Sequence, residues 1–112
     1  ELLVRKDPGE AVRLFQRAAD LGEPGAMNNL GIFYQSEIGV KRDDAEAIRW
    51  FRKASDLGYG DGTTNLGAAY ANGRGVRRDD KKAAELLRKA IAQGSTSAKT
   101  SLKFMIDHGR AR

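Results

Sequence analysis

The chain of 112 residues repeats itself every 36 residues, and this periodicity restricts its fold more than any other feature. Residues 26–61 and 62–97 align without a gap and are identical at 14 of 36 positions. In the same frame, residues 1–25 match the second half of a repeat and residues 98–112 match the first half of another. Such a period is typical of solenoids, in which supersecondary units stack in a row. We therefore predict a single repeat domain over residues 1–112.

Within each repeat, the spacing of apolar residues predicts two helices. Ala26, Leu30 and Tyr34 recur at i, i+4 and i+8, which places them on one helix face. Asp43 is a suitable N-cap for the helix that follows, and Glu46 is placed to complete a capping box. No such helix can bury its apolar face alone, so the sequence predicts an all-α fold, an α/α superhelix (solenoid) of antiparallel helix pairs. The expected helices are 8–21, 26–36, 44–57, 62–72, 80–93 and 98–108.

Two stretches between the paired helices, residues 36–44 and 72–80, combine glycine with arginine and aspartate. A phosphate-binding loop normally follows a strand and leads directly into a helix, whereas here a helix precedes each stretch. The acidic pair Asp79 and Asp80 would also repel a phosphate at the start of the next helix. We interpret the stretches as turns, in which Gly75 adopts a positive φ and Asp79 caps the following helix.

Composition excludes several classes of site. The chain has no Cys and one His, His108, so disulfides, thiolate chemistry and a multi-histidine zinc site cannot form within it. We expect no catalytic residues, no metal site and no cofactor. The chain starts with Glu1 and carries no targeting segment or membrane-spanning run, so we interpret it as a fragment of a larger protein. A bacterial cytoplasm and a periplasm are both compatible with it.

The two segments NLGIFYQSEIGVKRDDAEAIRWFRKASDLG and NLGAAYANGRGVRRDDKKAAELLRKAIAQG resemble Sel1-like repeats, which are relatives of the tetratricopeptide repeat. The resemblance covers essentially the whole chain, because small and turn residues recur in fixed register. It implies an α/α superhelix that acts as a non-catalytic scaffold or adaptor for protein–protein interaction. The expected partner is a protein or peptide, with no small-molecule substrate and no membrane insertion in this segment.

Several positions depart from the family pattern, and three of them predict a local structural difference. Glu37 stands where a loop glycine is expected, so we expect that turn to differ from the one at Gly73. Gly62 replaces an alanine, which predicts a loose start of the helix near 62–72. Lys103 replaces the glycine of the first helix, so we expect residues 98–112 to form a terminal, capping helix.

The first helices of a helix-pair solenoid line its concave face, and a helical wheel selects the residues that would point into it. Asn29 and Asn65 form a column, and an amide can both donate and accept hydrogen bonds to a peptide backbone. Tetratricopeptide grooves use asparagines in this way, although asparagine is also simply tolerated at half-exposed positions. The expected partner-binding residues are Asn28, Asn29, Ile32, Gln35, Thr64, Asn65, Ala68 and Phe104.

Two alternative functions remain open from the sequence. The net charge is +5 and basic residues cluster at 74–89, which permits binding of a polyanion or nucleic acid. The cluster comprises Arg74, Arg77, Arg78, Lys81, Lys82, Arg88 and Lys89, but acidic residues interrupt it, as on an ordinary solvated surface. An enzyme is disfavoured, because the similar repeat proteins linked to penicillin hydrolysis are stapled by disulfides and this chain has none.

Overall fold

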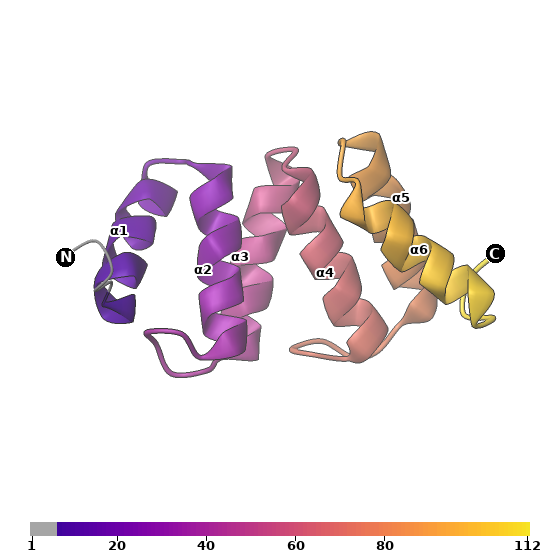
Figure 1. Ribbon diagram of the computed structural model, residues 1–112, viewed down its shortest axis with the longest axis horizontal. Coiled ribbons are helices and arrows are strands. Elements are labelled where there is room, and N and C mark those ends of the chain that lie inside the picture. The colour runs from indigo at the N-terminus through magenta and orange to yellow at the C-terminus, as the bar shows by residue number, and fades with distance from the viewer. Residues whose placement is uncertain (1–6) are drawn as a thin grey trace.

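The computed structural model describes residues 7–112, which form six helices and no strands. The helices are antiparallel neighbours along an elongated molecule of 48 × 25 × 24 Å (Figure 1). The predicted all-α solenoid is confirmed, and of the half repeat expected at residues 1–25, residues 1–6 lie outside the described part. The helices are α1 (Pro8–Asp20), α2 (Pro24–Ser36), α3 (Asp44–Asp56), α4 (Gly60–Asn72), α5 (Asp80–Ala92) and α6 (Ser97–Asp107).

The first and second helices of the repeats lie on different sides of the stack. Each helix packs on the next in the chain, and α4 also contacts both α2 and α6. The backbones of α1, α3 and α5 stand farther apart from one another within the described range. This spacing curves the array, so α2, α4 and α6 form its inner face and α1, α3 and α5 form its outer face.

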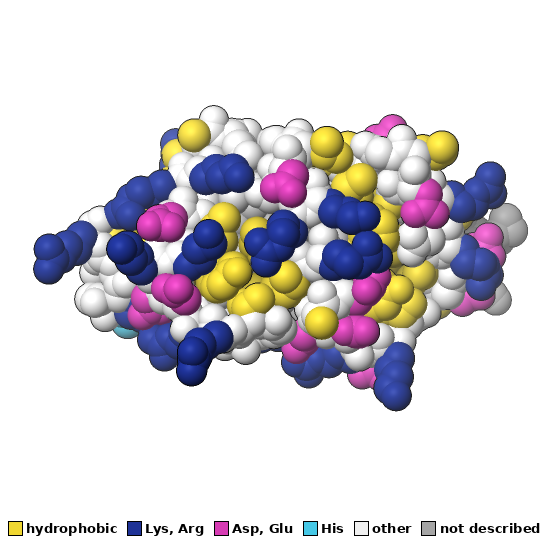
Figure 2. Space-filling view, turned by 180° about the vertical axis from the view of Figure 1, so that it is seen from behind, with side chains coloured by type: hydrophobic (Ala, Val, Ile, Leu, Met, Phe, Trp, Pro, Cys, Tyr) yellow, Lys and Arg dark blue, Asp and Glu magenta, His cyan; other side chains and the backbone are white. Residues whose placement is uncertain are grey.

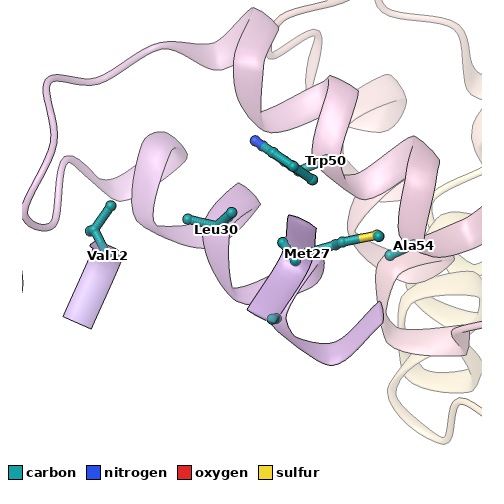
Figure 3. Close-up of a cluster of buried hydrophobic side chains, with 7 residues drawn as sticks. Val12, Met27, Leu30, Trp50 and Ala54 are labelled. Carbon is teal, nitrogen blue, oxygen red and sulfur yellow. The ribbon is translucent and has the colours of Figure 1, made fainter. Parts of the chain in front are cut away.

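Buried side chains form one apolar cluster at each junction between repeats. In the cluster at the N-terminal junction, Met27 reaches from α2 towards Ala54 of α3, and Trp50 lies alongside (Figure 3). Trp50 and Phe51 are 4% and 0% exposed, so both side chains pack between helices. The cluster contains Val12, Ala19, Ala26, Met27, Leu30, Trp50 and Ala54.

Glycines let the helices cross closely. A Cβ atom on Gly31 would lie 2.4 Å from Cε1 of Phe51, so α2 approaches α3 closely at this glycine. Gly62 has the same function, since its Cβ would lie 2.7 Å from Cβ of Ala54. The expectation of a loose helix start at Gly62 is therefore wrong: α4 begins two residues earlier, at Gly60, and Gly62 is buried where α4 crosses α3.

The helix starts follow the predicted caps with one difference. The side chain of Asp43 accepts a hydrogen bond from the amide of Glu46 at 3.0 Å. The reciprocal half of the capping box is missing, because the amide of Asp43 donates to the carbonyl of Tyr34 and the Glu46 carboxylate pairs with Arg49. The loop amide thus ties each second helix to the end of the first, an arrangement that Asp79 and Tyr70 repeat.

The two turns between paired helices have the same geometry, contrary to the expectation from Glu37. Glu37 adopts φ 56° and ψ 47°, and Gly73 adopts φ 69° and ψ 37°. Gly75 has φ 79°, which confirms the positive φ predicted for it. Stacking of the repeats imposes one turn conformation, and Glu37 adopts a left-handed backbone that disfavours a side chain.

Replacing Glu37 with glycine is therefore expected to stabilise the protein by about 1 kcal/mol, because it relieves the left-handed strain. Gly73→Glu is the matched reverse change and should lose a similar amount, since a Cβ there would come no closer than 3.4 Å to Arg78, an ordinary van der Waals contact. Chemical denaturation of both variants measures the effect. Equal stability of Glu37→Gly and the parent protein would show that this turn carries no strain.

Candidate functional site

The structure places the eight predicted binding residues at three depths on the inner face. Asn29, Ile32 and Gln35 on α2 and Asn65 and Ala68 on α4 are half-buried, and Phe104 on α6 is exposed. The remaining two, Asn28 and Thr64, are buried with exposed fractions of 6% and 7%. They line the seams between neighbouring helices, so six of the eight remain accessible to a partner.

The two asparagines of the column, Asn29 and Asn65, differ in their hydrogen bonding. Nδ2 of Asn65 donates to Oδ1 of Asn28 at 2.8 Å, which links α4 to α2. The side chain of Asn29 makes no hydrogen bond to any described residue. Asn29 therefore presents both a donor and an acceptor at the surface of the groove.

Thr64 belongs to a buried set of hydroxyl groups. Its Oγ1 lies 2.7 Å from Oγ of Ser95 and donates to the carbonyl of Gly60 at 3.0 Å. The bond to Ser95 ties α4 to the segment between α5 and α6, so the hydroxyl is used inside the fold.

Ala68 and Phe104 are brought together at a pocket between α4 and α6. The pocket has a volume of about 310 Å³, and Leu87 of α5 and Met105 of α6 also line it. Sequence reasoning missed these two residues, because they belong to the buried faces of their helices. The full lining is Ala68, Ala71, Asn72, Leu87, Thr100, Ser101, Phe104, Met105 and Arg110.

Arg110 lines this pocket and is held by the fold through its Nε and Nη2 groups. It donates to the two carboxylate oxygens of Asp80 at 2.8 and 3.2 Å and to the carbonyl of Ala71 at 2.5 Å. One repeat earlier, Arg74 donates to the carbonyl of Gln35 at 2.9 Å and lies 3.6 Å from Asp44. The two arginines are 36 residues apart, so extending the repeat alignment to residue 110 would have identified them.

The arginines around Asp80 stabilise its charged form. The guanidinium groups of Arg110 and Arg78, which donate hydrogen bonds to the carboxylate, hold the pKa of Asp80 well below its usual value. Arg42 acts on Asp44 in the same way and lowers the pKa of that carboxyl. The paired aspartates are thus a helix cap followed by an acidic first residue, as the sequence predicted.

The stability of the domain should depend on acid pH through Asp80. A carboxyl whose pKa is depressed in the folded state stabilises the fold above its unfolded pKa of about 3.9, and this contribution is lost as the pH falls. The difference in unfolding free energy between the parent protein and Asp80→Asn should be constant above about pH 5 and should shrink below about pH 4. Urea denaturation at several pH values measures it, with Asp56→Asn as control. A difference that persists unchanged at pH 2 would contradict the ion pairs.

The basic stretch 74–89 has fewer free cations than its sequence suggests. Arg74 and Arg78 are paired with aspartates, and Arg88 donates to the carbonyl of Arg112. On the face behind that of Figure 1, Lys and Arg are spread along the whole length and alternate with Asp and Glu (Figure 2). The charge is therefore distributed over that surface, without one concentrated patch.

Within residues 7–112, no three His, Cys, Asp or Glu side chains come close enough together to bind a metal ion. None of the described helices combines the length and the apolar character that crossing a membrane requires.

Comparison of the sequence with models of known protein families identifies the family of this chain. The model of the Sel1 repeat matches residues 2–23, 24–59 and 60–95, each of the last two being one period of the alignment described above. The chain belongs to the Sel1 repeat family. Sel1 repeats generally serve as protein-interaction scaffolds and are typically non-catalytic. A search of curated proteins finds no match.

Solved structures of Sel1 repeat proteins superpose on the chain. One is c5321, described as a protective antigen of uropathogenic Escherichia coli with an SLR fold: it is 40% identical, with a TM-score of 0.85 over 92% of this chain and 22% of its own. A Sel1 repeat protein from Oxalobacter formigenes is 36% identical, with a TM-score of 0.87 over 95% of this chain and 43% of its own. This chain therefore spans less than half the length of either.

A third similar structure is Helicobacter pylori cysteine rich protein B. It is 31% identical, with a TM-score of 0.75 over 81% of this chain and 68% of its own. Its name describes a cysteine-rich protein, whereas the present Sel1 repeat chain contains no Cys. The shared helix stack is therefore maintained here by apolar packing, hydrogen bonds and ion pairs alone.

Proposed function

We propose that this Sel1 repeat domain is a non-catalytic scaffold that binds an extended peptide, or an extended segment of a partner protein, along its concave face. The binding residues are the accessible members of the predicted set: Asn29, Ile32, Gln35, Asn65, Ala68 and Phe104.

The observation that carries this proposal is the unused polar side chain of Asn29 on the inner face. Asn29 is half-buried, and its amide has no partner among the described residues. Nearby, Ile32 and Ala68 are half-buried apolar side chains. A free amide beside apolar surface matches an extended backbone, which offers amide and carbonyl groups in alternation with side chains.

Binding of a polyanion through the basic surface at 74–89 is the competing proposal. This surface has fewer unpaired cations than the sequence suggested, because Arg74 and Arg78 form ion pairs with aspartates. Polyanion binding would weaken steeply between low and moderate salt, whereas binding through amides and apolar groups would not.

The test uses peptides selected from a random display library on the domain. Asn29→Ala should leave the melting temperature unchanged, because the fold does not use this amide. It should weaken peptide binding by about 1–3 kcal/mol, the cost of leaving a buried hydrogen-bonding partner unpaired. Asn65→Ala should weaken binding too, but with a loss of stability, because it also breaks the bond to Asn28.

Gln16→Ala, which changes an amide on α1, is the control and should change neither binding nor melting beyond its local bond to Asp20. Unchanged affinity of Asn29→Ala and Asn65→Ala would refute the proposal. Loss of binding between 50 and 200 mM salt, on the order of 10³-fold, would instead support the basic surface.

A further inference from the structure

Two residues that line the pocket between α4 and α6 have smaller side chains than their counterparts one repeat earlier. Ala68 of α4 corresponds to Ile32 of α2, and Leu87 of α5 corresponds to Phe51 of α3. Ala68 and Leu87 both line the pocket of about 310 Å³. At the equivalent step between α2 and α4, the larger Ile32 and Phe51 occupy these two positions.

The lining of this pocket is apolar at its base and carries uncharged polar groups beside it. Leu87 and Met105 are 1% and 2% exposed and form the base. Phe104, 53% exposed, forms one wall, and its ring stacks on that of His108 at a centroid distance of 4.0 Å. Nδ1 of His108 lies 2.8 Å from the Phe104 carbonyl, so the two residues hold each other in place. Thr100, Ser101 and Asn72 supply hydroxyl and amide groups.

Arg110 is the one ionised residue among those that line the pocket. Its Nε and Nη2 groups are already bonded to Asp80, which also pairs with Arg78, and to the carbonyl of Ala71. A charged group placed against the apolar base of the pocket would lose its water of hydration, which is costly. Lys and Arg are prominent on the reverse face of the molecule (Figure 2). The apolar base and the uncharged polar groups of the lining therefore favour an uncharged occupant here.

We propose that this pocket receives one uncharged apolar side chain, of the size of Leu, Met or Phe, from the peptide that lies along the concave face. The inference rests on the proposed function and adds the chemistry of the partner: an extended segment with one apolar anchor and uncharged neighbours. The volume lies at the low end of the roughly 300–1,000 Å³ of ligand pockets, which fits a side chain better than a cofactor. Phe104 supplies the aromatic wall, and Asn29 bonds the backbone farther along the groove.

The first arm of the experiment is the sequence of the peptides selected from the random library. Selected peptides should share one position enriched in Leu, Met, Ile or Phe and should be depleted of Asp, Glu, Lys and Arg beside it. Replacing the anchor by Asp should abolish binding. A selected set that is rich in acidic residues and lacks an apolar position would overturn the proposal.

The second arm fills the pocket with a side chain that the preceding repeat already carries. Ala68→Ile should weaken binding of a selected peptide about tenfold or more while melting is unchanged, because the added methyl groups occupy the anchor site. Ala45→Ile, the same change at an exposed position of α3, is the matched control and should have no effect. If Ala68→Ile lowers melting, Phe104→Ala replaces it, since that side chain is exposed and its loss should weaken binding similarly.

The two proposals fail in different ways. Retained affinity in Ala68→Ile and Phe104→Ala, with weakened binding in Asn29→Ala, would overturn the pocket and leave concave-face binding intact. Retained affinity in all three variants would overturn both.

Discussion

Gly31→Ala is expected to destabilise the domain by about 3 kcal/mol or more, the upper part of the range for overpacked cores. The new Cβ would lie 2.4 Å from Cε1 and 2.6 Å from Cδ1 of Phe51, closer than any real carbon contact. Phe51 is fully buried, so its ring cannot move aside without displacing α2 from α3. The higher helix propensity of alanine offsets only about 1 kcal/mol of this cost.

The equivalent glycine one repeat later provides the control. A Cβ on Gly67 would lie 3.2 Å from Cγ and Cδ2 of Leu87, a contact that a small movement of leucine can relieve. Gly67→Ala should therefore be nearly neutral. Combining Gly31→Ala with Phe51→Leu, which copies the Gly67 environment, should recover part of the loss. Denaturant midpoints of the parent protein, the two single variants and the double variant measure these differences. Equal losses of unfolding free energy for Gly31→Ala and Gly67→Ala would contradict the packing of Gly31 against Phe51.

Gly75→Val is the second large loss expected, also about 3 kcal/mol or more, from a left-handed backbone and a steric clash combined. Gly75 has φ 79°, where a β-branched residue is an outlier. Its Cβ would also lie 2.6 Å from the carbonyl oxygen of Asp44 and 2.9 Å from Cγ1 of Ile48. The carbonyl of Asp44 belongs to the backbone of the preceding repeat, so it cannot move aside as the end of a flexible side chain could.

Gly94→Val separates the two contributions to this loss. Gly94 has φ 98° but no neighbouring atom within 4 Å of a new Cβ, so only the backbone strain applies. Thermal melting should rank Gly75→Val below Gly94→Val and both below the parent protein. A Gly75→Val protein that melts normally but has lost an anionic ligand would show that the glycine-rich stretch is a binding loop after all.

Features that repeat at 36 residues were predictable from the sequence, because each appears at least twice in the same local context. The helix pairs, the caps at Asp43 and Asp79 and the positive φ of Gly75 belong to this group. Glu37 was mispredicted because its side chain disfavours a conformation that the stacked repeats nevertheless impose. The intrinsic preference of Glu is against a left-handed backbone, but the packing of the repeats determines the φ and ψ angles at this position.

Contacts at positions that differ between repeats were not predictable. Oγ1 of Thr63 lies 2.5 Å from both Ser55 Oγ and Gln93 Oε1, which joins α3, α4 and the end of α5. One repeat earlier the same positions carry Ala19, Met27 and Leu57, so an alignment of repeats gives no sign of a polar network.

The candidate site was partly predictable for the same reason. The helical wheel placed Asn29, Ile32 and Ala68 on the inner face, because helix periodicity sets the direction of each side chain. It could not show that Asn28 bonds to Asn65, since that contact depends on how closely α2 approaches α4. The pocket between α4 and α6 was also missed, because its base combines buried side chains of two helices, Leu87 of α5 and Met105 of α6.

The most direct test of concave-face binding is an NMR titration of the ¹⁵N-labelled domain with a selected peptide. We expect the largest chemical-shift changes on α2, α4 and α6, at Asn29, Asn65, Ala68 and Phe104. The outer faces of α3 and α5 should remain unchanged. Shift changes concentrated at Arg52, Lys53, Arg88 and Lys89, with the inner helices unaffected, would contradict it and place the partner on the outer, basic side.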